Sequence, residues 1–168
     1  MQSDHITTME DFMKKIEKVV VNSGIGRRSQ EDHFEDKGLP EIEKDLAAIT
    51  GQKASRRQAK QSIAGFKVRA GQIIGLKVTL RGSRMKNFLE KTINLALPRV
   101  KDFRGLNLSN VDANGNLNIG FKDQTVFPEI ELEKTRTTFG IQVTIVPKDK
   151  NRDAAIDLYR NLGVPLKK

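Results

Sequence analysis

The stretch from Gly75 to Arg81 places polar side chains at every second position. The two sets alternate strictly, with Lys77, Thr79 and Arg81 standing between Leu76, Val78 and Leu80. A period of two puts the sets on opposite faces of a β-strand. One face can seal a core, while the other presents two cations and a hydroxyl to a partner.

Positive charge is concentrated around this stretch. Between Lys53 and Arg104 there are 14 Lys or Arg and two acids, so the segment has a net charge of +12 in a protein of net +9. The remaining residues carry 16 bases and 19 acids, a net charge of −3. A local excess of this kind indicates a polyanionic partner. The alternative, a face that only makes the protein soluble, fits this segment less well because such faces usually mix positive and negative charges.

Residues suited to catalysis or metal binding are few. The two histidines, His5 and His33, lie in polar surroundings, and a Ser-His-Asp or Cys-His set has no other histidine on which it could be built. Three acids, Glu129, Glu131 and Glu133, would share one face of an extended segment, but a solvated edge is the better interpretation. We therefore predict that the protein is not an enzyme and has no catalytic residue, no metal site and no cofactor.

Two glycines in Ser23-Gly24-Ile25-Gly26 raise the alternative of a nucleotide-using enzyme. The fragment lacks the Lys-Ser/Thr of a P-loop and the third glycine of a dinucleotide site. We interpret it as a strand end at which glycine lets another backbone approach closely.

Apolar periodicity predicts the elements that position these residues. Strands are expected at 16–22, 65–70, 75–81, 117–122 and 139–145. Helices are expected at 42–49, 83–96 and 154–162, with Ser83 as a cap, Pro98 as a terminator, and Gly51 and Gly163 at stop positions. Residues 52–62 should form a loop or a helix with little to bury, Asn114-Gly115 a hairpin turn, and 125–133 a loop or an edge strand.

The predicted strands are apolar on one face only. This pattern is typical of a two-layer α+β fold, an antiparallel sheet with helices packed on one face and an open polar, basic face. The residues expected on the open face are Asn22, Lys67, Arg69, Lys77, Thr79, Arg81, Asn118, Lys122, Gln142 and Thr144.

Length and composition set further bounds. The 168 residues suit a single domain over 1–168, in which 1–15 form a short arm or helix before the main domain at 16–168. The chain has no cysteine, which fits a reducing compartment. No apolar run approaches the roughly 20 residues needed to cross a bilayer, and the first residues carry acids without an apolar stretch. We therefore expect no membrane partner and no signal peptide.

Aromatic residues are predicted to be absent from the open face, because the strand Phe residues fall on its apolar side and the chain has no Trp. Surfaces that stack single-stranded bases normally use aromatic side chains. The sequence therefore favours contacts to the phosphates, 2′-hydroxyls and grooves of a folded RNA.

Several long motifs are similar to those of a known family. DLAAITGQK, AGFKVRAGQIIGLKVTLRGSRM, LPRVKDFRGL and GNLNIGFKDQTVFPEI occur in this order, followed by a closing helix and VPLKK. The chain from about Lys18 onward resembles bacterial-type large-subunit ribosomal protein L-five, which binds 5S rRNA in the central protuberance. The resemblance implies a structural constituent of the large subunit, in cytoplasmic or organellar ribosomes.

The resemblance also implies site residues and partners. Asn22, Gln52 and Thr79 correspond to family residues that contact 5S rRNA, and Lys77 and Arg81 flank Thr79 on the same predicted face. The basic segment at 57–72 corresponds to a family loop that reaches P-site tRNA and a small-subunit head protein. We assign Arg56, Arg57, Lys60, Ser62, Lys67 and Arg69 to this loop. Large-subunit rRNA and neighbouring large-subunit proteins complete the implied partners.

Three features depart from the family pattern. The region before the first strand is shorter than usual, Ser23 replaces a common Met, and Ala54 stands where Pro is common. The alternative function that the residues leave open is a structured-RNA-binding module or RNA chaperone outside the ribosome.

Overall fold

A computed structural model describes residues 9–168 of the chain. The part of the expected N-terminal arm at 1–8 lies outside the described residues. The strands are β1 (Ile16–Gly24), β2 (Ser55–Gln58), β3 (Ile73–Leu80), β4 (Leu117–Phe121) and β5 (Ile141–Pro147). The α-helices are α1 (Met9–Lys15), α2 (Leu39–Thr50), α3 (Gly82–Lys91), α4 (Leu97–Arg99) and α5 (Arg152–Leu162). Seven short 3-10 or π-helical turns, η1 to η7, lie between them in the described part.

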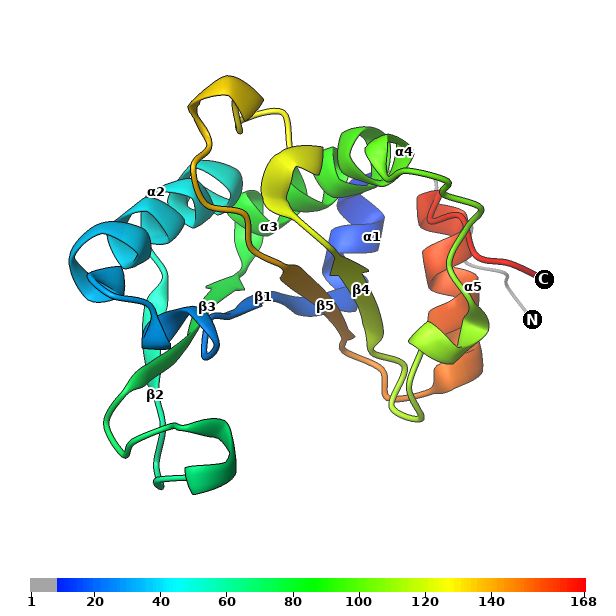
Figure 1. The fold of residues 1–168 in the computed structure, drawn as a ribbon. Helices are drawn as coiled ribbons and strands as arrows, with labels where there is room; N and C mark the ends of the chain where they lie inside the picture. Colours follow the sequence, from blue (N-terminus) through cyan, green and yellow to red (C-terminus); the bar gives the residue numbers. More distant parts are fainter. Residues whose placement is uncertain (1–8) are drawn as a thin grey trace, which may run out of the picture. The chain divides into compact units, whose positions relative to one another are not determined.

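The strands form one antiparallel sheet in the order β2-β3-β1-β5-β4, so the predicted α+β class is confirmed (Figure 1). Burial alternates along β1, β3, β4 and β5 as period two requires. In β3, for example, Leu76, Val78 and Leu80 are buried while Lys77 and Thr79 are half-buried.

The chain divides into two compact units built from interleaved segments. One unit comprises 21–79 and 120–142, and its helix α2 buries Leu39, Ile42, Leu46 and Ile49. The other comprises 1–20, 80–119 and 143–168, and in it α1 contacts both α3 and α5. The prediction of a single domain over 1–168 stays a prediction.

The strand predicted at 65–70 is wrong. The sheet contains β2 instead, which was not predicted as a strand. Residues Ala64–Phe66 form a 3-10 turn, and Lys67 has a left-handed backbone with φ of 52°. β2 falls in the segment expected to be a loop or a helix. All four of its side chains are exposed, so it has no apolar alternation to detect, and its pairing with β3 defines it as a strand.

Two predicted helix boundaries also differ. The helix at 83–96 begins at Gly82 without a capping bond from Ser83, and it continues through the π-turn η4 (Thr92–Ala96) into α4. Pro98 therefore does not stop it. The helical run ends at Arg99, one residue after Pro98.

Two predicted turns have different outcomes. The hairpin at Asn114-Gly115 is confirmed, since Gly115 has φ of 80° between the bridged residues Val111 and Leu117. The close backbone approach predicted for the Gly24 and Gly26 pair is absent at Gly24, where an added Cβ would meet no atom within 4 Å, while at Gly26 an added Cβ would lie 3.9 Å from the Ile74 carbonyl oxygen. Gly24 is exposed at the end of β1.

Candidate nucleic-acid interface

Three of the predicted site residues stand at outward positions of neighbouring strands. Lys77 and Thr79 of β3 alternate with Leu76 and Val78, which are each 1% exposed. In β1, Asn22 stands between two buried residues and is itself half-buried. Among the described residues, the side chains of Asn22, Lys77 and Thr79 have no hydrogen-bonding partner. We call these three residues the sheet-face set.

Gln52 supports this set from the end of α2. The helix ends at Thr50, and the C-cap residue Gly51 has a left-handed φ of 72°. The Gln52 side-chain Nε2 then donates to the backbone carbonyl of Thr79 at 3.1 Å. Gln52 therefore fixes the backbone that carries the Thr79 hydroxyl. Arg81 belongs to the other unit, where it is exposed directly before α3.

The pairing of β2 with β3 separates two adjacent arginines. Arg57 pairs with Gly75 and Ser55 pairs with Lys77, so by alternation Arg57 and Ser55 share the face that carries Lys77. Arg56 pairs with buried Leu76 and belongs to the opposite face.

Arg56 forms a bidentate ion pair with Glu43 of α2. Its Nε donates to Glu43 Oε1 at 2.6 Å, and its second guanidinium nitrogen donates to Oε2 at 3.0 Å. This hydrogen bonding from Arg56 lowers the pKa of Glu43. The Glu43 side chain is 15% exposed. Arg56 is thus held in the protein, whereas Arg57 has no side-chain partner in the described part of the chain.

The loop at 59–72 connects β2 to β3 and projects from the ends of these strands that lie away from α2 (Figure 1). Backbone hydrogen bonds connect Ala59 with Gln72 and Gly71 at 2.8 Å each, and two further bonds join Ile63 and Val68 at 2.9 and 3.2 Å. Ser62 Oγ accepts from the N–H of Ala70 at 2.9 Å, which gives this predicted contact residue a structural role. We call residues 59–72 the basic loop.

Side chains from the segment after β1 hold the basic loop in place. The Gln72 Nε2 donates to Ser29 Oγ at 2.7 Å, and the Gln30 Nε2 donates to the carbonyl of Phe66 at 2.7 Å. The cationic residues Lys60, Lys67 and Arg69 are exposed on this fixed backbone. Lys67 and Arg69 do not belong to the sheet, contrary to the expectation that they stand on its open face.

Phe66 corrects the prediction that the strand aromatics all lie on the apolar side. It is 71% exposed in the basic loop, and Ile63, three positions earlier in the sequence, is 49% exposed. The sequence misled here because Phe66, Val68 and Ala70 mimic a strand alternation inside a turn.

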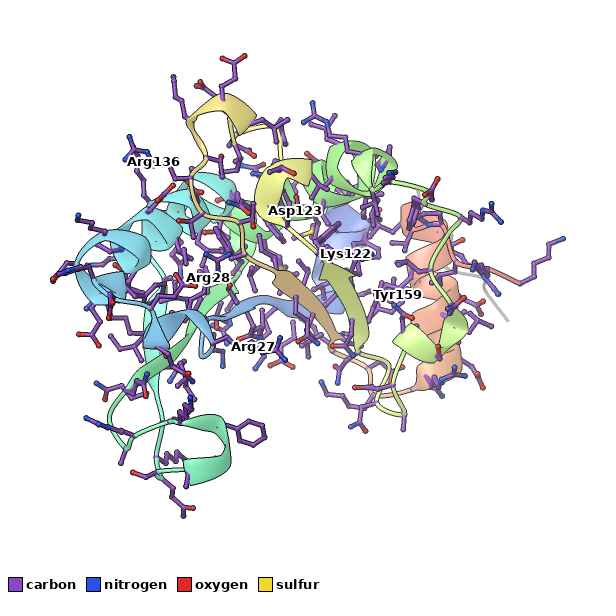
Figure 2. All side chains as sticks on the ribbon, in the orientation of Figure 1. Arg27, Arg28, Lys122, Asp123, Arg136 and Tyr159 are labelled. Carbon is purple, nitrogen blue, oxygen red and sulfur yellow. The ribbon has the colours of Figure 1, made fainter. Side chains whose placement is uncertain are left out.

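Three further cations, Arg27, Arg28 and Lys122, lie outside the predicted contact residues (Figure 2). Lys122 was expected on the open sheet face, but it is exposed directly after β4. With residues of the basic loop, the three cations line a cleft of about 960 Å³. In the sequence, the adjacent Arg27 and Arg28 after Gly24 and Gly26 could have indicated a cationic site. The mixed charge of the residues that follow obscured this pattern.

The described residues contain no group of three or more His, Asp or Glu that could hold a metal ion. Glu129, Glu131 and Glu133 are exposed, as expected of a solvated edge. In the same part of the chain, no helix is long and apolar enough to cross a membrane.

Comparison with known proteins identifies the family. Residues 13–69 match the model for ribosomal protein L5, and residues 73–166 match the model for the C-terminal part of the ribosomal L5 family. The large ribosomal subunit protein uL5 of Dictyoglomus turgidum is 49% identical over 154 residues, which cover 92% of this chain and 84% of the relative. The uL5 of Syntrophomonas wolfei is 46% identical over 153 residues, covering 91% and 84% respectively. The chain belongs to the uL5 family.

As a uL5 family member, the chain is a structural constituent of the large ribosomal subunit and not an enzyme. It acts in translation within a ribonucleoprotein, binds rRNA, and is located in the ribosome of the cytoplasm, as its bacterial relatives indicate. Membership of this family favours the ribosomal function over the alternative of a module outside the ribosome.

Proposed function

We propose that this uL5 protein binds 5S rRNA through the sheet-face set, with Gln52 and Arg81 contributing beside it. The observation that carries the proposal is the alternation in β1 and β3. Asn22, Lys77 and Thr79 point away from a packed core, and their side chains have no partner within the described chain. Their hydrogen-bonding capacity is thus available to an RNA.

The chemistry of the set fits a folded RNA better than single-stranded bases. The Lys77 ammonium is suited to a phosphate, while the Asn22 amide and the Thr79 hydroxyl can bond 2′-hydroxyls and base edges. None of the three is aromatic, so the set has no ring on which a base would stack. Hydrogen bonds from side chains that are held on rigid strands would instead recognise one shape of the RNA backbone.

We further propose that the basic loop contacts P-site tRNA and a protein of the small-subunit head. Exposed Lys60, Lys67 and Arg69 would meet the tRNA backbone. The backbone bonds within the loop and its ties to Ser29 and Gln30 support this role, because they hold the loop in one conformation. Loops fixed on a rigid scaffold commonly carry function.

The test measures 5S rRNA affinity by filter binding. Thr79→Val keeps the shape of the side chain but removes the hydroxyl, and Asn22→Ala removes the amide. Each change should weaken binding by about 1 kcal/mol, roughly fivefold. Thr79→Ser keeps the hydroxyl and is the matched control. Normal affinity in both Thr79→Val and Asn22→Ala would refute the proposed site.

Replacing Lys60, Lys67 and Arg69 together with Gln tests the basic loop. The proposal expects near-normal 5S rRNA affinity with weaker retention of P-site tRNA on assembled ribosomes. If the triple variant instead loses 5S rRNA as severely as Thr79→Val does, the loop belongs to the 5S rRNA site.

A further inference from the structure

We infer that the cleft beside the basic loop is a second RNA site, which takes one unpaired nucleotide of ribosomal RNA. The cleft lies within the unit formed by 21–79 and 120–142, and its volume is about 960 Å³. Pockets for small ligands and cofactors measure roughly 300–1,000 Å³. None of Asn22, Gln52, Lys77, Thr79 and Arg81 lines it, so the inference goes beyond the proposed 5S rRNA site.

The walls of the cleft are apolar and partly aromatic. They include Ile25, Ile74 and Val68, together with two aromatic residues, Phe66 and Phe139. Phe139 is buried, whereas Phe66 is 71% exposed and its carbonyl is held by Gln30. An exposed ring on a fixed backbone can stack against a base, and the gain is similar for every base.

The charged residues that line the cleft all have the same sign. They are Arg27, Arg28, Lys60 and Lys122, and no acid is among the lining residues. Figure 2 labels Arg27, Arg28 and Lys122. Within residues 9–168, no acid or hydrogen-bond acceptor pairs with these four side chains. Apolar walls alone would suit a protein side chain, but four unpaired cations favour the phosphates that flank a base.

These features together describe a site for a nucleotide that has left its helix. The base would enter against Phe66, and the adjoining phosphates would meet Arg27, Arg28 and Lys122, which leaves Lys60 to the contact proposed for the basic loop. Unpaired, splayed-out bases are the usual targets of such sites in RNA-binding proteins. The sheet-face set has no aromatic residue, so the two surfaces would recognise different features of rRNA.

The first experiment measures binding of fluorescein-labelled hexauridylate to the full chain by anisotropy. Phe66→Leu keeps an apolar side chain but removes the ring, and it should weaken binding about fivefold or more. Gly24→Leu should also weaken binding, because Gly24 lines the cleft and a Cβ there meets no other atom, so the added side chain occupies the cleft. Thr79→Val should leave hexauridylate binding unchanged, which separates this site from the proposed 5S rRNA site.

A charge-matched pair of variants controls for general electrostatics. Arg28→Gln with Lys122→Gln removes two cleft cations, and Lys37→Gln with Lys44→Gln removes two exposed cations elsewhere in the same unit. The cleft pair should weaken hexauridylate binding about fivefold more than the control pair. Equal losses in the two pairs, or unchanged binding in Phe66→Leu and Gly24→Leu, would overturn the inference.

The second experiment identifies the occupant in the ribosome. A benzophenone amino acid replaces Gln61, an exposed and uncharged residue of the cleft, and large subunits containing the variant are irradiated. The inference expects a crosslink to an unpaired rRNA nucleotide, present without tRNA. A crosslink only to tRNA, or only to a protein, would overturn it.

Discussion

Arg56 and Arg57 are adjacent in the chain but lie on opposite faces of β2, so they offer a matched test of which face meets RNA. We expect Arg57→Gln to weaken 5S rRNA binding and Arg56→Gln to leave it unchanged. Arg57 shares its face with Lys77 and has no partner among residues 9–168, whereas the Nε and one terminal nitrogen of Arg56 donate to the two carboxylate oxygens of Glu43.

The magnitude follows from the bond that Arg57 would make. A hydrogen bond between a charged group and its partner contributes about 1.5 kcal/mol at the lower end of its range, which is roughly tenfold in Kd. Removing one phosphate contact should also reduce the slope of log K against log salt by about 1. Arg56→Gln should change neither quantity, because its guanidinium is already committed within the protein.

Filter binding of 5S rRNA at several salt concentrations measures both quantities for the two variants. Circular dichroism shows that each variant is folded. The reasoning is refuted if Arg56→Gln weakens binding as much as Arg57→Gln, because the sheet face would then not be the RNA face. Unchanged affinity and slope in Arg57→Gln would place the boundary of the 5S rRNA site between β2 and β3.

Three other predictions concern salt, pH and packing. If about five phosphates are neutralised, 5S rRNA affinity of the wild type should fall with a log–log salt slope of roughly −4, and a slope near zero would exclude an electrostatic interface. The hydrogen bond from Arg56 lowers the pKa of Glu43, so the ionised carboxylate stabilises the fold above its unfolded pKa and this contribution is lost as the pH falls. Urea midpoints measured between about pH 5 and 3 should therefore fall less steeply for Glu43→Gln than for the wild type. Tyr159 is fully buried and donates to the carbonyl of Gly115 at 2.6 Å, so Tyr159→Phe should reduce the free energy of unfolding by about 1–2 kcal/mol in urea titrations, while an unchanged midpoint would show that this bond contributes nothing.

The sequence was sufficient for elements whose apolar residues repeat with one clear period. α2 and β3 are examples, because each buries one face and the burial leaves a pattern in the residues. The positions of Lys77 and Thr79 followed from the same pattern. β2 left no such pattern, since all its side chains are exposed and only its pairing with β3 defines it.

Other features depend on contacts between residues that are distant in the sequence. Arg56 appeared to be a free cation because Glu43 lies 13 positions away. The cleft combines Arg28 with Lys122 and with the basic loop, three segments that no local spacing connects. The motif resemblance supplied Asn22 and Gln52, but the bond from Gln52 to Thr79 was visible only in three dimensions.

The ties between the basic loop and Ser29 and Gln30 also bear on the speed of assembly. An unrestrained loop of this length would sample many conformations, and most collisions with its partner would meet an unsuitable one. In this protein the basic loop takes up its conformation when the chain folds, before any partner binds. Association through the loop should therefore be limited by diffusion and orientation, and the ties to Ser29 and Gln30 would help to set the association rate.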